Sequence, residues 1–365
     1  MVFIVFGIIF FLNFFFLFTK SGPSKFYISV FSLSIFFILL LGVKETADSE
    51  GYMNFFENDE VKTDFLFRNL STLFTNFGME YYQLFQFHVI LFGILYTFFI
   101  SRFTNNIFLI LIFYLLMLYV PLANQIRYYL AFGFFLNAIY LLYFSKKKYL
   151  AYLFIIISIL SHSAITLFYG FIILNKFSQN NNYLKRCLII SLVFFALIFS
   201  LNSLGLNAFI GNYELYFSND AMSSLLGGVF NALPNIIIII LLYIRAKIAL
   251  KKHEVFKQDK SFQILYRLSF YSVIFMPASL YIQILSHRYI QASLIIWLCF
   301  YCYTLTLEKS FKVVFNHIIC LTGVIIGLFY YTYFFSEIAL GETSFYLKEF
   351  IRSFNSIEYL PNIEL

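Results

Sequence analysis

An arginine and two amides lie where an apolar helix is expected to begin, and their chemistry suits an anion. In LANQIRYYLAFGFFLNAIYLL (122–142), Asn124, Gln125 and Arg127 precede a long apolar run. Spacings of three and four residues would place Asn124, Arg127 and Tyr128 on one helical face. Helix N-termini attract anions, and arginine adds a two-pronged donor for phosphate. The alternative is an arginine that only reaches toward the membrane–water interface.

A histidine between two serines is the second group that could do chemistry. His162 lies between Ser161 and Ser163 in SILSHSAITLF. A neutral imidazole can take a proton from a hydroxyl group, so His162 is a candidate general base. The alternative is a buried histidine whose hydrogen bonds are satisfied by the two serines or by a backbone carbonyl.

A polar stripe near the C-terminal third is the third candidate. In QILSHRYIQAS (283–293), Gln283, His287 and Gln291 recur every four residues, and Arg288 lies three residues before the last of them. The stripe flanks a short turn that is expected on the same membrane side as the first arginine. Arg288 is therefore a second candidate for binding an anion. The alternative is a turn whose polar residues cap helix ends.

An acidic segment after the second apolar run is the fourth candidate. Residues 44–80 are rich in Asp and Glu, and Asp48, Glu50 and Tyr52 stand at their start. A carboxylate near two arginines could act as a base or accept a sugar hydroxyl. The alternative is an ordinary solvated acidic loop.

The composition defines the elements that must position these groups. Of the 365 residues, 61% are hydrophobic and only 12% are charged, whereas a soluble domain carries about 25% charged residues. We therefore predict an all-α, polytopic integral membrane protein with about eleven to twelve transmembrane helices, folded as a single domain over 1–365. The expected spans are the apolar runs at 2–18, 26–43, 81–100, 107–122, 126–144, 187–201, 227–245, 264–285, 289–307 and 313–335.

Loop charges predict which side of the membrane each connection occupies. Basic segments at 19–25, 145–148 and 245–260 are expected in the cytoplasm, and the acidic 44–80 loop, 202–226 and the C-terminal tail outside. The net charge of +7 comes from these short segments, so it does not indicate nucleic-acid binding.

The segment 149–174 lies between two basic loops and needs a topology of its own. Because 175–186 is also basic, 149–174 is expected to enter the membrane and return, as a short hairpin bent at His162. One long tilted helix is the alternative. The hairpin would leave both termini outside, and the run at 2–18 is expected to be retained because no cleavage site follows it.

The cysteines and histidines do not predict a metal site. Cys299 and Cys302 form a C-x-x-C, but they lie inside the helical run LIIWLCFYCYTL with no further ligands nearby. They are expected to be packed residues of a membrane helix. No cofactor is expected.

The sequence from 124 to 168 resembles the core of the EpsG/Wzy-type polysaccharide polymerases. The family's arginine, basic turn and histidine–serine pair are matched by Arg127, by SKKK at 145–148, and by His162 with a neighbouring serine. Its acidic segment with a tyrosine is similar to Asp48 and Tyr52 here. Its late arginine corresponds to Arg288, followed by Tyr289.

The resemblance implies a membrane glycosyltransferase of the bacterial inner membrane. It would join undecaprenyl-diphosphate-linked oligosaccharide units on the outer face, as in O-antigen or capsule assembly, and a chain-length regulator is a further candidate partner. Arg127 and Arg288 would stabilise the leaving diphosphate without a metal ion, and His162 or Asp48 would accept the proton. The expected substrate-binding residues are Asn124, Gln125, Tyr128, Tyr52, His287, Tyr289 and Gln291.

Two other functions remain open at this stage. A flippase or transporter for the same lipid-linked saccharide would show internal pseudo-symmetry, which the sequence does not reveal. An O-antigen ligase also depends on arginine and histidine, but it usually places its histidine in a large outer loop. The corresponding connections here are short or lack histidine, apart from His287.

Overall fold

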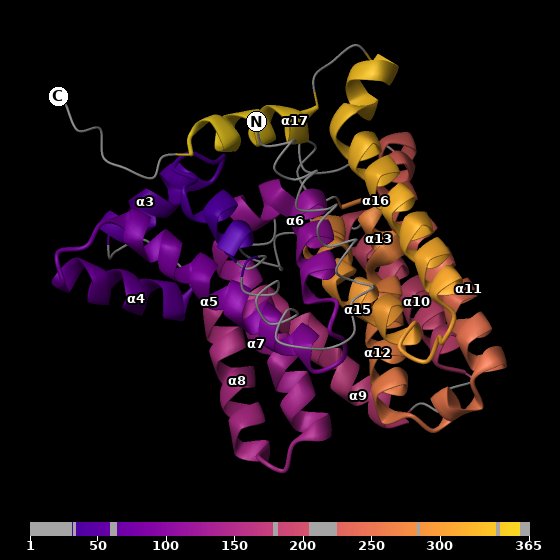
Figure 1. The fold of residues 1–365 in the computed structure, drawn as a ribbon. Helices are drawn as coiled ribbons and strands as arrows, with labels where there is room; N and C mark the ends of the chain where they lie inside the picture. Colours follow the sequence, from indigo (N-terminus) through magenta and orange to yellow (C-terminus); the bar gives the residue numbers. More distant parts are fainter. Residues whose placement is uncertain are drawn as a thin grey trace. The chain divides into compact units, whose positions relative to one another are not determined.

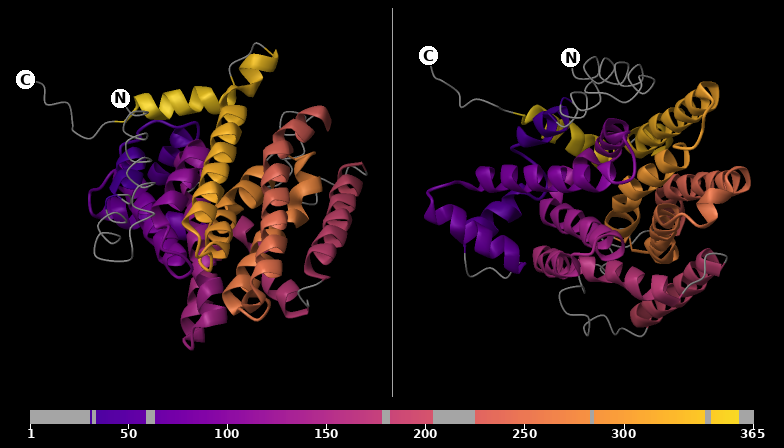
Figure 2. Two further views of the ribbon diagram at one scale, coloured as in Figure 1. Left: turned by 45° about the vertical axis from the view of Figure 1, so that its right-hand side comes forward. Right: turned by 60° about the horizontal axis from the view of Figure 1, so that its bottom comes forward.

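Helices make up all the longer regular elements in the described part of the chain. A computed structural model describes residues 31, 34–58, 64–177, 182–203, 225–282, 285–340 and 344–357 (Figure 1). Two further views show helical ribbons throughout its coloured elements (Figure 2). The expected span at 2–18, most of the 202–226 connection and the end of the C-terminal tail lie outside these residues.

Within the described residues, six helices are long and apolar enough to cross a membrane. The prediction of an all-α polytopic membrane protein is therefore confirmed. These candidate spans are Tyr81–Ser101, Ile107–Asn124, Ile126–Phe144, Tyr183–Ser200, Ala232–Lys252 and Phe311–Phe335.

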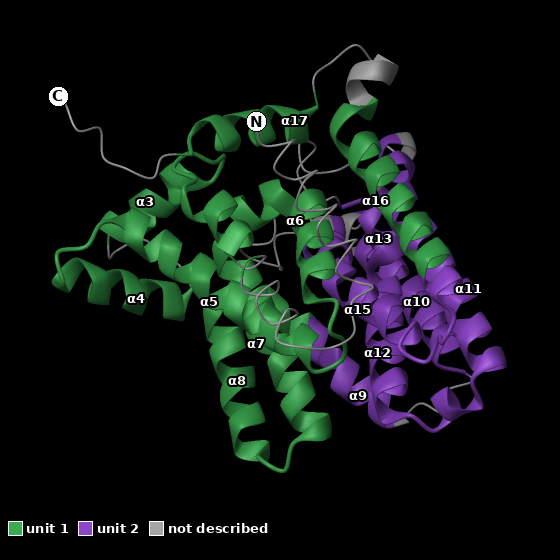
Figure 3. Ribbon diagram, viewed as in Figure 1, with its two compact units in different colours: residues 1–167, 315–365 green, residues 168–314 purple. Residues whose placement is uncertain are grey.

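The chain divides into two compact units (Figure 3). Unit 1 comprises residues 1–167 and 315–365, and unit 2 comprises residues 168–314. The expected single domain over 1–365 stays a prediction.

Helix α7 (Ile126–Phe144) packs against α5 (Tyr81–Ser101) and α8 (Lys148–Ser161) in unit 1. Asn137 Nδ2 donates a hydrogen bond to the carbonyl of Leu95 on α5 (2.9 Å). Ser158 Oγ on α8 donates to the carbonyl of Ala131 (2.7 Å). Most of α7 is buried by protein, which explains why its sequence is apolar on nearly every side.

The region predicted to be an acidic loop contains two helices. α3 (Ser49–Glu57) buries Tyr52 and Phe56, and α4 (Phe65–Asn76) buries Phe67. Apolar positions three or four residues apart give each helix one face toward the protein. The two helices pack against one another and against α5 (Figure 1).

The C-terminal part of unit 1 is a long helix followed by an amphipathic one. α16 (Phe311–Leu340) belongs to unit 1 from residue 315 onward, and α17 (Phe345–Asn355) follows it. Ser344 begins α17: its hydroxyl accepts from the Leu347 N–H (3.0 Å) and donates to the Tyr333 carbonyl (2.6 Å). α17 then packs on α6 (Ile107–Asn124), where the Phe350 ring contacts that of Tyr119.

Unit 2 contains two long helices and a series of short ones. α10 (Tyr183–Ser203) and α11 (Leu225–Lys252) are the long helices. The short ones are α9 (Gly170–Phe177), η4 (Glu254–Lys257), α12 (Lys260–Tyr271), η5 (Ser272–Phe275), α13 (Met276–Ser279), η6 (Ser286–Ile290), η7 (Gln291–Ser293) and α15 (Leu294–Thr304).

The predicted spans at 264–285 and 289–307 each consist of several consecutive short helical elements in the described residues. The first run breaks into α12, η5 and α13, and the second begins with the π-helix η6 and the 3₁₀ turn η7. Pro277 lies at the start of α13 and cannot continue a hydrogen-bonded helix that precedes it.

A buried arginine fixes the end of α11 in unit 2. Arg245 is 3% exposed, and its Nε and Nη2 donate to the hydroxyl and the carbonyl of Thr304 (both 2.8 Å). Nη2 also lies 3.5 Å from the Glu308 carboxylate, which pairs in addition with Lys252 and His253. Burial raises the pKa of Glu308, but the bond to Lys252 and the nearby positive charges outweigh it and hold that pKa below its usual value.

Candidate active site

The predicted anion-binding residues lie at a break between two helices rather than on one helix. α6 ends at Asn124, α7 begins at Ile126, and Gln125 between them is non-helical (φ −106°, ψ 50°). The expectation that Asn124, Arg127 and Tyr128 share a face of one helix was therefore wrong. Pro121 accounts for a second distortion one turn earlier: it lacks an N–H and its ring disturbs the preceding turn, where Leu118 leaves helical geometry.

The guanidinium of Arg127 is held by a carboxylate and three aromatic rings in unit 1. Its Nη1 lies 3.0 Å from Asp64 Oδ2, and the two side chains are 16% and 17% exposed. Its central carbon lies 4.9 Å from the ring centre of Tyr52, 5.2 Å from that of Phe55 and 5.3 Å from that of Phe67. Arg127 therefore does not simply reach to solvent, because ion-pair and cation–π contacts fix its orientation.

The carboxylate that contacts Arg127 is one the sequence analysis did not single out. Asp64 directly precedes α4, which brings it to the start of α7. Asp48, the predicted candidate base, directly precedes α3, is exposed, and does not use its side chain to cap that helix. The available signal was the amphipathic sequence that follows Asp64, because it predicts a helix packed on the bundle rather than a solvated loop.

Tyr52, predicted to bind substrate, lies beside the arginine. Tyr52 is buried, faces the Arg127 guanidinium, and stacks on Tyr81 with ring centres 6.4 Å apart. The tyrosine thus orders the arginine directly, and any contact with a sugar stays a prediction.

His162 lies at the end of α8, close to the start of α7. The α8 helix stops at Ser161, and His162 is extended (φ −163°, ψ 116°), so the predicted bend is present. Fourteen residues of α8 span about 21 Å, less than the apolar core of a bilayer at about 30 Å. The return of 149–174 to its starting side stays a prediction.

The His162 ring is fixed by two contacts within unit 1. It packs edge-to-face on the Tyr128 ring at 5.5 Å, next in sequence to Arg127. Its Nδ1 accepts a hydrogen bond from the backbone N–H of Ala164 (3.3 Å). A neutral ring that accepts at Nδ1 carries its proton on Nε2, so the remaining nitrogen is a donor.

Two amide oxygens at the helix break are buried without a hydrogen-bond donor among the described residues. Asn124 is 6% exposed, and neither its Oδ1 nor the Oε1 of Gln125 has a hydrogen-bond partner within the described residues. Buried carbonyl oxygens without donors cost about 1–3 kcal/mol each. They are suited to hydroxyl groups, which sugars supply in abundance.

The late polar stripe forms a π-helix in unit 2. Arg288 and Tyr289 lie in η6, and the Tyr289 ring stacks on that of Phe275 at 4.4 Å. Gln291 begins the following 3₁₀ turn, so the four-residue spacing of the stripe does not lie on a regular α-helical face. Gln283 and the side chain of His287 lie outside the described residues. Short π-helices are frequent at functional sites, so this segment stays a candidate.

Comparison with known proteins supplies the family. A model of the EpsG family matches residues 25–347, which include the four candidate catalytic residues. The chain belongs to the EpsG family. No curated protein and no solved structure matches it.

Membership in the EpsG family confirms the resemblance and makes the chain a polysaccharide-polymerase-type membrane protein. In this EpsG protein the described residues hold no group of three metal-binding side chains. Cys299 and Cys302 are buried and free within α15. In unit 1 Arg127 pairs with Asp64, His162 packs on Tyr128, the residue after Arg127, and the two amides lie at the helix break just before it.

Proposed function

We propose that this EpsG-family protein polymerises undecaprenyl-diphosphate-linked oligosaccharide units on the outer face of the bacterial inner membrane. The product would be an O-antigen or capsular polysaccharide. The observation that supports it most is the fixed guanidinium of Arg127 at the start of α7, where the next residue, Tyr128, contacts His162 and the preceding helix break holds unpaired amide oxygens. This combination offers cationic and N–H donors for a diphosphate and acceptors for sugar hydroxyls.

The reaction transfers the growing chain from one lipid diphosphate to a new unit. The acceptor hydroxyl oxygen attacks the anomeric carbon of the donor sugar, and the bond from that carbon to the diphosphate oxygen breaks. The bonding electrons leave with undecaprenyl diphosphate, whose growing negative charge Arg127 stabilises. The hydroxyl proton passes to a base, and metal-free catalysis is part of this proposal.

We assign different tasks to the two candidate proton-transfer residues. Because the Ala164 N–H occupies Nδ1 of His162, the Nε2–H of the neutral ring donates to a diphosphate oxygen. Asp48 is then the candidate base. Asp64 positions Arg127, and Arg288 with Tyr289 stays a second candidate pair for the donor diphosphate.

Complementation of a polymerase-deficient strain tests the proposal. Arg127→Ala, His162→Ala and Arg288→Ala should each abolish long polysaccharide while single units remain displayed outside. Arg102→Ala is a matched control. The central guanidinium carbon of Arg102 also lies over an aromatic ring, 4.2 Å from the ring centre of Phe98, but Arg102 follows the C-terminal end of α5, away from the α3 and α4 side chains that hold Arg127. Wild-type chain length in all three site variants would refute the proposal, and single units retained inside the cell would indicate a flippase.

The donor assignment of His162 has its own test. Glutamine keeps an N–H donor but cannot take up a proton near neutral pH. His162→Gln should therefore retain measurable polymerisation where His162→Ala loses it. Equal loss of polymerisation in both variants would assign His162 as the base instead. The residual activity of the glutamine variant should then lack one arm of the wild-type pH–activity profile.

A further inference from the structure

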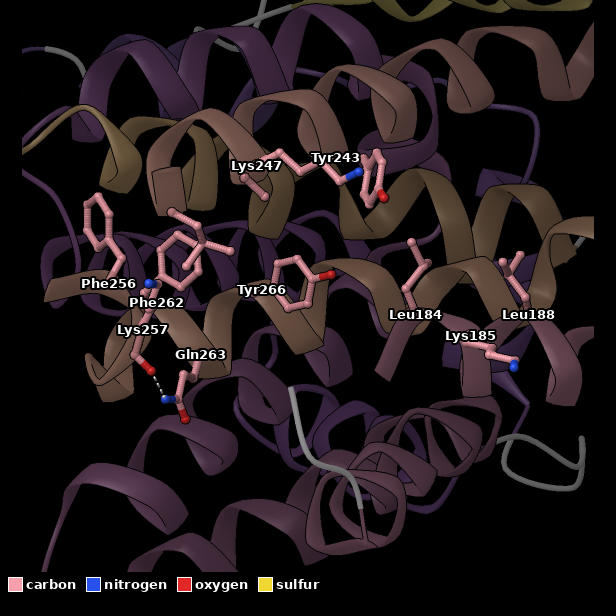
Figure 4. A pocket seen from close by; sticks show the side chains of 12 residues that line it. Leu184, Lys185, Leu188, Tyr243, Lys247, Phe256, Lys257, Phe262, Gln263 and Tyr266 are labelled. Carbon is pink, nitrogen blue, oxygen red and sulfur yellow. Dashed lines mark hydrogen bonds between the residues drawn. The ribbon is translucent and has the colours of Figure 1, made fainter. Parts of the chain in front are cut away.

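Unit 2 contains an open pocket that the proposed reaction does not use. It has a volume of about 780 Å³ and is lined by residues of α10, α11, α12 and η4 (Figure 4). Sites of this size hold ligands of several tens of atoms. The pocket brings the start of α10 together with the end of α11, so the basic segments at 175–186 and 245–260 meet at one end of the unit.

The polar lining of this pocket is positively charged. Lys185, Lys247 and Lys257 come from α10, α11 and η4, and none of the lining residues, all within the described chain, is acidic. Lys247 Nζ lies 4.7 Å above the ring of Tyr243. Lys257 pairs with Glu254 at 2.8 Å, but both side chains are mostly exposed, so this pair is weak.

The floor of the pocket is aromatic and aliphatic. Phe262 and Tyr266 of α12 line its middle, and Phe256 of η4 lines one edge (Figure 4). Gln263 fixes η4 against α12 by donating to the Lys257 carbonyl (2.7 Å), so the floor is part of a bonded framework. A ligand of this pocket therefore needs an anionic group beside an apolar body.

The apolar lining continues into surfaces that face away from the protein. Leu188 lines the pocket and is itself 49% exposed, and Leu192, one turn further along α10, is 64% exposed. On α11, Ile244 and Ile248 lie on either side of Lys247 in the sequence and are exposed as well. In a membrane such side chains contact acyl chains, so the pocket opens next to lipid tails.

We infer that this pocket binds an anionic phospholipid, with the headgroup in the positive field of the lysine-bearing rim (Lys185, Lys247 and Lys257) and the acyl chains along α10 and α11. Basic pockets between membrane helices on the cytoplasmic side bind such headgroups, and the positive-inside rule assigns this end of the unit to the cytoplasm. The inferred ligand is distinct from the sugar-bearing lipid of the proposed reaction.

Native mass spectrometry of the full chain, released from detergent with added lipid, tests this inference. We expect phosphatidylglycerol to bind more tightly than phosphatidylcholine, while inorganic phosphate and glycerol 3-phosphate bind no more than weakly. Lys185→Gln or Lys247→Gln should each weaken phosphatidylglycerol binding about five-fold, and the double variant about thirty-fold. Glutamine keeps most of the side-chain stem, and both lysines are exposed.

The control is a double variant with the same charge loss elsewhere. Lys146→Gln with Lys147→Gln removes two exposed lysines from the turn between α7 and α8 in unit 1, and it should bind phosphatidylglycerol as the wild type does. Equal weakening in both double variants would overturn the inference, as would equal binding of the two lipids. Binding of inorganic phosphate as tight as that of the lipid would assign the pocket to a soluble anion.

Discussion

The ion pair between Arg127 and Asp64 allows a structural role and a catalytic role to be separated. The pair is 3.0 Å long with each side chain about five-sixths buried. Exposed pairs contribute about 0–1 kcal/mol, and breaking a fully buried pair costs about 3–5 kcal/mol. We therefore expect Asp64→Asn to lower the free energy of unfolding by about 2 kcal/mol.

Arg127→Gln should cost more than Asp64→Asn, because it also removes the contacts with three aromatic rings. Each cation–π contact contributes about 0.5–1 kcal/mol, so the three contacts add about 1.5–3 kcal/mol to the loss of the ion pair, and about 3.5–5 kcal/mol is expected in total. The double variant should be less destabilised than the sum of the two single variants, because no unpaired charge remains.

Thermal unfolding in detergent and chain-length analysis in cells measure the two roles. For a domain of this size, about 2 kcal/mol corresponds to a decrease of about 4–8 °C in Tm. Asp64→Asn should lose about 10–100-fold in polymerisation, because a misplaced arginine stabilises the leaving group less well. Arg127→Gln should lose polymerisation completely, and the double variant should also be inactive although its destabilisation is smaller than the sum of the two single variants.

Recovery of long polysaccharide in the double variant would refute this reasoning. It would mean that Arg127 serves only to neutralise Asp64 and to hold α4 against the start of α7. Arg127→Lys is an informative second variant, since lysine keeps the charge but lacks the planar fork that binds a diphosphate.

Three further predictions concern the framework of the two units. Glu308→Gln should destabilise unit 2 by about 3 kcal/mol at pH 7. The pKa of Glu308 is lowered in the fold, so the wild type should lose this stability as the pH falls through that pKa. The stability of the variant should not show this loss. Tm measured from pH 7 to pH 3.5 checks this. Gly228→Ala should lower Tm, because a Cβ there would overlap the backbone carbonyl of Leu280, whereas Gly327→Ala on the open side of α16 should not. Ser158→Ala should cost about 1 kcal/mol by removing the bond to the α7 carbonyl, and it should leave chain length unchanged.

Composition and hydropathy predicted the membrane class and several helix boundaries. The run at 126–144 coincides with α7, and the run at 81–100 differs from α5 by one residue. This agreement has a physical basis, since a span must be both apolar and about 20 residues long. The bend at His162 was predicted too, because two basic loops could not otherwise lie on one side.

Hydropathy was least informative where tertiary contacts decide the conformation. The run at 264–285 is apolar throughout, yet Pro277 and packing inside unit 2 divide it. The partner of Arg127 lies 63 positions earlier in the chain, and only the fold of α3 and α4 brings Asp64 there. Charge counting found an acidic segment but could not choose among its carboxylates.

The most direct test of the central claim uses the purified protein in liposomes. The substrate is undecaprenyl-diphosphate-linked repeat units added on one side, and the products are separated by chain length on a gel. The account predicts a ladder of polymers that requires Arg127, is retained with Arg102→Ala, and releases one undecaprenyl diphosphate for each new linkage. Repeat units that stay single, or that only change sides of the membrane, would contradict it.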